Sequence, residues 1–213
     1  MDRKPVSVKS YANIAIVKYW GKADAERMIP STSSISLTLE NMYTETKLSF
    51  LPEDATSDVM YIDDELQGEK ETTKASKVLD LFRTNPNQYV KIETWNNMPT
   101  AAGLSSSSSG LSALVKAANE LFQVGKTQSE LAQIAKFASG SSSRSFFGPL
   151  AAWDKDSGEV YQVETDLKLA MIMLVLTDQK KPVSSRDGMK LCTETSTSFP
   201  EWIKQSGRIT RIC

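Results

Sequence analysis

The sequence predicts an α+β fold, in which a strand-rich first half is followed by a helical second half. Before residue 96, apolar and polar residues alternate with a period of two, which is typical of strands. From about residue 106, apolar residues recur at helical spacing. Strands followed by helices are typical of α+β domains. We expect residues 1–165 to form an N-terminal domain and residues 166–213 to be the incomplete start of a second domain.

Five segments of the first half are expected to form strands: 5–17, 33–40, 44–51, 58–62 and 88–95. They are rich in Val, Ile, Thr, Ser and Tyr, most of which favour strands. In 33–40, Ser34 and Ser36 alternate with Ile35 and Leu37, so one face is polar and the other apolar. Segment 70–83 has a weaker helical pattern.

The second half is expected to contain two amphipathic helices and several shorter elements. The first helix covers about 106–122, and the second begins after Thr127, which forms a capping-box pattern with Glu130. Short strands at 148–153 and 159–163, a buried strand at 169–176 and a helix at 193–205 complete the prediction.

The composition excludes several kinds of chemistry. The chain has no histidine, which excludes His-activated nucleophiles and most zinc sites. Its two cysteines, Cys192 and Cys213, have no metal-ligand spacing, and its net charge of -1 provides no basic field for nucleic acid. No apolar run reaches the roughly 20 residues of a membrane span, and the first ten residues lack a signal peptide's apolar stretch. We therefore expect a cytoplasmic protein whose Lys, Arg, Ser and carboxylate side chains suit phosphoryl transfer.

A loop of small residues, Pro99–Gly110, joins the last predicted strand of the first half to the first amphipathic helix. Small residues allow a ligand to approach the backbone, and the unpaired N–H groups at a helix start favour phosphate. The loop matches neither the Walker pattern nor Gly-x-Gly-x-x-Gly. On the residues alone, a phosphate loop and a serine-rich helix cap are equally good interpretations.

Two further segments carry cations among small or aromatic residues. Lys18-Tyr19-Trp20-Gly21-Lys22 follows the first strand and can present two ammonium groups to a polyanion, although solvated lysines at a strand end are the simpler interpretation. Ser139-Gly140-Ser141-Ser142-Ser143-Arg144 follows the second helix. Its arginine can bind a carboxylate or phosphate with two parallel hydrogen bonds, and an ordinary surface loop remains the alternative.

The motifs together resemble one enzyme family. Pro-Thr-Ala-Ala-Gly-Leu-Ser-Ser-Ser, from Pro99, resembles the Pro-x-x-x-Gly-Leu-x-Ser-Ser motif of the GHMP kinase superfamily. The stretch that ends in Tyr-Trp-Gly-Lys at Lys22, the Ser-Gly-Ser-x-x-Arg stretch that ends at Arg144, and residues 183–189 resemble the diphosphomevalonate decarboxylase family. The likeness runs from about Val8 to about Ile203. It implies a GHMP-kinase-type two-layer fold with a ribosomal-protein-like N-terminal domain.

The resemblance implies ATP-dependent decarboxylation of mevalonate 5-diphosphate to isopentenyl diphosphate, with Mg²⁺. It also implies that the enzyme is a homodimer and that the reaction belongs to the mevalonate pathway of isoprenoid synthesis. It assigns the ATP phosphates to Pro99, Ala101, Ala102, Gly103, Leu104, Ser105, Ser106 and Ser107. It assigns the substrate to Tyr19, Trp20, Gly21, Lys22, Ser139, Gly140, Ser141, Ser142, Ser143, Arg144 and Ser185. Lys18, Ser107 and Arg144 are the candidate catalytic residues, with Arg144 on the carboxylate and both lysines on the diphosphate. A GHMP small-molecule kinase, such as mevalonate or phosphomevalonate kinase, is the alternative, and an RNA-binding module is disfavoured by the charge.

One part of the family pattern is not found. The family's catalytic aspartate lies in a downstream Asp-x-Gly-Pro-type segment that this sequence does not contain, so we expect the chain as written to be a defective enzyme. Residues 206–213 are basic and β-branched, unlike the helix predicted before them. We expect this tail to result from a one-base frame change.

Overall fold

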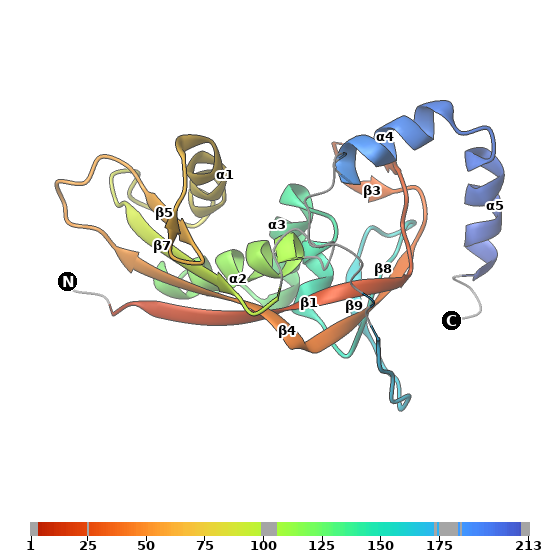
Figure 1. Ribbon diagram of the computed structural model, residues 1–213, viewed down its shortest axis with the longest axis horizontal. Coiled ribbons are helices and arrows are strands. Elements are labelled where there is room, and N and C mark those ends of the chain that lie inside the picture. Colours follow the sequence, from red (N-terminus) through yellow and green to blue (C-terminus); the bar gives the residue numbers. More distant parts are fainter. Residues whose placement is uncertain are drawn as a thin grey trace.

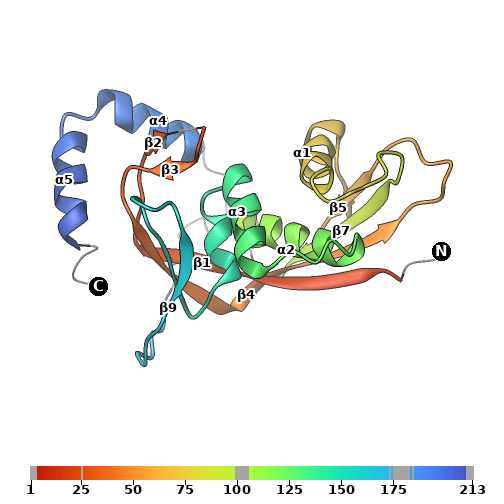
Figure 2. The same ribbon diagram turned by 180° about the vertical axis from the view of Figure 1, so that it is seen from behind.

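The computed structural model describes residues 4–24, 26–98, 106–172, 174, 183 and 185–209, with the side chains of 185, 186, 208 and 209 excepted. A seven-stranded sheet forms one layer, and α1, α2 and α3 lie over one of its faces (Figure 1). Helices α4 and α5 lie at the opposite end of the sheet from α1 (Figure 2). The α+β prediction is therefore confirmed.

A single long strand organises the sheet. Its members are β1 (Val6–Val17), β4 (Ser34–Phe50), β5 (Val59–Ile62), β6 (Glu65–Leu66), β7 (Val90–Asn96), β8 (Leu150–Trp153) and β9 (Val160–Val163). Strand β4 pairs antiparallel with β1, and also with β7 through residues 44–50 and with β8 through residues 34–37. The pairing of β5 with β7 is parallel, and β2 (Lys22–Asp24) and β3 (Ile29–Pro30) form a separate two-stranded sheet.

The two strands predicted at 33–40 and 44–51 are one strand of 17 residues, so the break between them was wrong. The register of β1 against β4 shifts here, because Tyr11 pairs with Tyr43 and Ala12 pairs with Leu39. Residues 40–42 therefore form an irregularity within a paired strand and do not form a turn.

The helices predicted at 70–83, at 106–122 and after Thr127 are confirmed. Helix α1 is Glu69–Leu79, α2 is Ser106–Leu121 and α3 is Gln128–Ala138. The capping box of α3 is present, since the Thr127 hydroxyl accepts from the Glu130 N–H while the Glu130 carboxylate accepts from the Thr127 N–H. Ser142–Phe146, which had been treated as a loop, forms the short 3₁₀ helix η1.

The end of the chain differs from the prediction. The helix predicted at 193–205 is two helices, α4 (Ser185–Thr195) and α5 (Phe199–Ile209). Pro200 lacks an N–H and clashes with the preceding turn of a helix, so it fits the first turn of α5 but not a continuous helix. Residues 206–209 of the tail continue α5.

The prediction of a buried strand at 169–176 was wrong for the described residues of this run. Residues 169–172 and 174 form no strand, and Leu169, Ile172 and Leu174 are 45%, 88% and 86% exposed. No described strand pairs with these residues, and an apolar run needs such pairing to become a buried strand.

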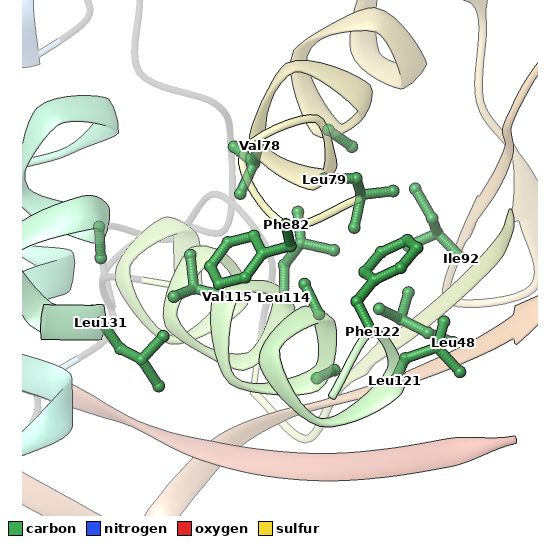
Figure 3. Packing of buried hydrophobic residues seen from close by; sticks show 14 of the residues in the cluster. Leu48, Val78, Leu79, Phe82, Ile92, Leu114, Val115, Leu121, Phe122 and Leu131 are labelled. Carbon is green, nitrogen blue, oxygen red and sulfur yellow. The ribbon is translucent and has the colours of Figure 1, made fainter. Parts of the chain in front are cut away.

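Two hydrophobic clusters lie on opposite faces of the sheet. The larger one fills the space between the sheet and α1, α2 and α3, where Phe82, Leu114 and Phe122 meet Leu48 and Ile92 (Figure 3). Ala12, Leu37, Leu39, Met98 and Leu150 form the smaller cluster. No helix among the described residues has the length and apolar character that crossing a membrane requires.

Candidate functional site

Arg144 is a buried cation at the centre of the candidate substrate site. It lies in η1, and only 3% of its surface is exposed. Its Nη1 donates to Ser34 Oγ at 2.9 Å and its Nε donates to Ser36 Oγ at 3.1 Å, while no described carboxylate pairs with it. Burial lowers the pKa of Arg144 to about 10, which the nearby Tyr19 partly offsets, so the side chain is still a cation at neutral pH. A buried charge without a partner anion favours an anionic ligand.

An edge-to-face aromatic pair lies on one side of this site. The Tyr19 ring lies 5.8 Å from the Arg144 guanidinium carbon and packs edge-on against Trp153, with 4.9 Å between ring centroids. Gly140 lies against both rings, because a Cβ there would come 2.6 Å from Trp153 Cζ3 and 3.2 Å from Tyr19 Oη. The structure therefore brings together the two sequence segments that were expected to bind the substrate.

Asn13 connects the end of β1 to the Ser139–Arg144 segment. Its Nδ2 donates to the Ser141 carbonyl at 3.0 Å and to Ser145 Oγ at 2.7 Å. The buried Asn13 Oδ1, Ser142 Oγ and Trp153 Nε1 have no hydrogen-bond partner among the described residues. Buried polar atoms normally have partners, so these three atoms are exceptions in this part of the interior.

The Lys18–Lys22 segment is only partly directed at Arg144. The exposed Lys18 Nζ donates to the Ala15 carbonyl at 2.9 Å, and Lys22 Nζ lies 3.0 Å from Met28 Sδ. The Trp20 N–H donates to Thr32 Oγ1 at 3.2 Å. Gly21 has φ of 82° and lies against Phe199, where a Cβ would come 2.9 Å from the ring. Gly21 thus sets the turn and allows α5 to approach it.

The remaining substrate candidates lie around the same turn. Ser139 caps the end of α3, and its hydroxyl is 3.2 Å from that of Ser141. Ser143 Oγ donates to the Gly140 carbonyl at 2.7 Å, which holds the turn closed. Ser185 begins α4, and its side chain lies outside the described part of the structure.

A cavity of about 380 Å³ lies at the start of α2 and is separate from the Arg144 site in its lining. Ser106 and Ser107, the first two residues of α2, are on its wall together with Gly110. Its other lining residues come from α1, α2 and the strands: Thr44, Thr46, Met60, Ile62, Glu71, Lys74, Ala75, Val78, Ile92, Thr94, Asn96, Leu111 and Leu114. A largely apolar cavity beside a helix N-terminus suits a ligand that joins a flat apolar group to phosphates.

The rest of the expected phosphate loop, Pro99 and Ala101 to Ser105, lies outside the described residues. Sequence reasoning missed Ser34, Ser36, Trp153 and the cavity lining. The alternation of Ser34 and Ser36 with apolar residues showed a polar face, but nothing in that pattern showed that this face is the inner one. Asn13 lies in the stretch that ends at Lys22, but the sequence assigned it no role.

Lys116 on α2 is a second largely buried cation. Its Nζ donates to Ser10 Oγ at 3.2 Å and to the Ser145 carbonyl at 3.3 Å, and it lies 4.9 Å from the Phe146 ring centroid. Burial lowers the pKa of Lys116 from its ordinary 10.5 to about 8. All these partners are neutral, so the folded state bears the cost of the buried charge at neutral pH.

Replacing Lys116 by methionine is therefore expected to raise Tm at pH 7. Between pH 8 and 10.5 the folded wild-type chain loses this proton before the unfolded chain does, so the wild-type free energy of unfolding rises through this range. The advantage of Lys116→Met in thermal melts should accordingly shrink as the pH is raised from 7 to 10. Lys70→Met, at an exposed position, should change Tm little at any pH, and a constant Lys116→Met advantage would contradict the assignment.

The fold and these two sites define a class of protein: an α+β domain with a buried cation that no described carboxylate pairs with, and with a cavity at the start of a helix. A family model described as the diphosphomevalonate decarboxylase-like N-terminal domain matches residues 10–164. The chain therefore belongs to the diphosphomevalonate decarboxylase family.

Individual relatives agree with this assignment. Diphosphomevalonate decarboxylase of Saccharomyces cerevisiae is 35% identical over 222 residues, covering 93% of this chain and 56% of that protein. The solved structure of mevalonate pyrophosphate decarboxylase from Streptococcus pyogenes is 65% identical with a TM-score of 0.93, covering 99% of this chain and 67% of that one. A solved complex of MDDEF with MVAPP, AMPPCP and magnesium is 35% identical with a TM-score of 0.80, covering 96% and 66%. The chain thus spans little more than half the length of the curated relative.

Proposed function

We propose that this chain provides the substrate and nucleotide sites of an enzyme that decarboxylates mevalonate 5-diphosphate. ATP is consumed, and the products are isopentenyl diphosphate, ADP, phosphate and CO₂. The observation that carries the proposal is the buried Arg144, whose charge has no anionic partner among the described residues. A substrate carboxylate is an anion that suits the planar guanidinium of this side chain.

The diphosphate end of the substrate is assigned to hydroxyls and amines around the same turn. Ser139 and Ser141 lie within 3.2 Å of each other and can both donate to phosphate oxygens. Lys22 is half-buried on β2. Lys18 is exposed directly after β1, and it would exchange its hydrogen bond to the Ala15 carbonyl for a bond to the bound polyanion. Tyr19 and Trp20 supply walls that lower the local dielectric and strengthen these contacts.

The nucleotide is assigned to the cavity at the start of α2. The apolar walls of the cavity fit the adenine base, and the first N–H groups of α2 favour the phosphates. The hydroxyls of Ser106 and Ser107 fit a Mg²⁺ ion that is held mainly by those phosphates. Such an ion would neutralise phosphate charge during transfer.

The chemistry follows from a poor leaving group. A tertiary 3-hydroxyl leaves with difficulty. When this hydroxyl attacks the γ-phosphorus of ATP, it loses its proton to solvent and ADP is released, and the new phosphate group then leaves easily as inorganic phosphate. Its departure places positive charge on C3, and the electrons of the carboxylate C–C bond then form the double bond as CO₂ is lost. Arg144 holds the carboxylate in place, and the Tyr19 and Trp153 rings keep water from the reacting carbons.

Binding and product analysis test the proposal. Calorimetry should show that the 213-residue chain binds mevalonate 5-diphosphate, and that it then binds AMPPCP with Mg²⁺. Fusing residues 1–205 to the remaining third of the Streptococcus pyogenes relative should give equimolar ADP and CO₂ from ATP and mevalonate 5-diphosphate. ADP without CO₂ would favour a kinase, and failure of the chain to bind mevalonate 5-diphosphate would contradict the proposed function.

Family membership also supports a cytoplasmic homodimer as the working state. Light scattering after size-exclusion chromatography should give twice the mass of the fused chain, and a monomer at all concentrations would contradict this part of the proposal.

A further inference from the structure

Arg144 is held by two serine hydroxyls on neighbouring inward positions of β4. Ser34 accepts from Nη1 at 2.9 Å and Ser36 accepts from Nε at 3.1 Å, and both serines are 0% exposed. Residues two apart on a strand project from the same face, so Ser34 and Ser36 of β4 can accept hydrogen bonds from two different nitrogens of the guanidinium. Together with Tyr19, which lies beside the guanidinium, the two bonds fix how Arg144 presents its remaining N–H groups.

The chemical nature of the two acceptors is informative. Buried arginines are commonly paired with carboxylates, as Arg83 is with Asp58 at 2.6 Å elsewhere in this chain. At Arg144 the acceptors are neutral, so they orient the guanidinium without cancelling its charge. The other three of its five N–H groups have no partner among the described residues. These three groups lie on both terminal nitrogens, which together can bind a carboxylate bidentately.

We propose that Ser34 and Ser36 are positioning residues that aim Arg144 at the substrate carboxylate and, being uncharged, leave its full charge available to that anion. This inference rests on the proposed function for the identity of the anion. The inference goes beyond the proposed function because it assigns the specificity for a carboxylate-bearing ligand to Ser34 and Ser36 as well as to Arg144.

Two kinds of substitution separate orientation from charge. Ser36→Ala and Ser34→Ala each remove one restraint on the guanidinium, and the double variant should bind mevalonate 5-diphosphate at least about tenfold more weakly in calorimetry. Ser34→Asp places a carboxylate beside Arg144, and we expect a loss of about 100-fold or more although Arg144 is still present. Ser49→Ala, on the same strand at an outward position, should bind like the wild type.

A ligand-free measurement keeps the test independent of the proposed function. In ¹⁵N-labelled chain, the Arg144 Nε–H signal is identified by its absence from the Arg144→Lys spectrum. It should exchange slowly with solvent in the wild type and in Ser49→Ala, and much faster in Ser36→Ala. Circular dichroism and thermal melts confirm that each variant is folded before it is compared.

The outcomes are distinct. Slow exchange at Arg144 that Ser36→Ala abolishes, with weaker binding by the double variant, supports the inference. Unchanged exchange in Ser36→Ala, or wild-type affinity of the folded double variant or of Ser34→Asp, overturns it. If the wild-type chain binds no mevalonate 5-diphosphate but Ser36→Ala still frees Arg144, the proposed substrate fails while the positioning role of Ser36 holds.

Discussion

Replacing Arg144 by lysine is expected to weaken the binding of mevalonate 5-diphosphate by about 30-fold or more. The truncation of one partner of a buried charge pair costs about 2–5 kcal/mol, and about 1.4 kcal/mol corresponds to a factor of ten. Lysine keeps the charge but loses the planar fork, the two serine contacts and the paired donors that match a carboxylate. Titration calorimetry of the chain with mevalonate 5-diphosphate measures the change directly.

The matched control is Arg27→Lys. Arg27 is exposed and pairs with Asp24 at 3.9 Å, so the same chemical change there should leave the affinity within about twofold, as for other surface ion pairs. The far-ultraviolet circular dichroism of both variants should match the wild type. Wild-type affinity in Arg144→Lys would remove Arg144 from the site.

Replacing Gly140 by alanine is expected to destabilise the chain by about 1–3 kcal/mol and to abolish substrate binding together. The added Cβ would lie 2.6 Å and 2.7 Å from two atoms of the Trp153 ring and 3.2 Å from Tyr19 Oη. Trp153 is completely buried and cannot swing into solvent, so the turn or the aromatic pair must move. Either movement displaces Tyr19 from Arg144. Urea unfolding and calorimetry measure the two effects.

Gly68→Ala is the control for this substitution, because a Cβ at Gly68 meets no atom within 4 Å. It should leave binding intact and cost about 1 kcal/mol at most, because Gly68 is the N-cap of α1, where alanine is less favourable than glycine. In the double variant Gly140→Ala/Trp153→Leu, the smaller side chain should recover part of the lost stability. If the losses in the free energy of unfolding from the two substitutions were additive in the double variant, a steric clash between the alanine and Trp153 would be contradicted.

The fold was predictable where apolar residues recur with one regular spacing over many residues. Helices α2 and α3 are long and amphipathic, and the Thr127–Glu130 capping box marked the start of α3. Sequence reasoning failed where partners decide the outcome. The apolar run near residue 172 reads as a buried strand only if another strand pairs with it, and no described strand does. A period of two likewise marks the alternate faces of β4 without showing which one is covered.

The candidate site was predictable in its motifs but not in its contacts. Tyr19, Gly140 and Arg144 were singled out from separate segments, and the structure brings them into one cluster. The direction of a side chain depends on its packing against other elements, which the spacing of residues in the sequence does not predict. Lys18, for example, hydrogen-bonds to its own strand, and Trp153 lay in a segment that was predicted only as a strand.

The register shift at Tyr11 and Ala12 has a consequence for how β1 can change in length. Before the shift Ser10 faces the helices, and after it Asn13 does. These residues are three apart, so the alternation of side chains is displaced by one residue between them. Deleting one residue between them would place Asn13 two positions after Ser10, so a regular strand would still turn Asn13 inward. Deleting two residues would turn Asn13 outward and place the apolar side chain of Ile14 beside Ser145. We therefore expect β1 to tolerate the loss of one residue at this point better than the loss of two.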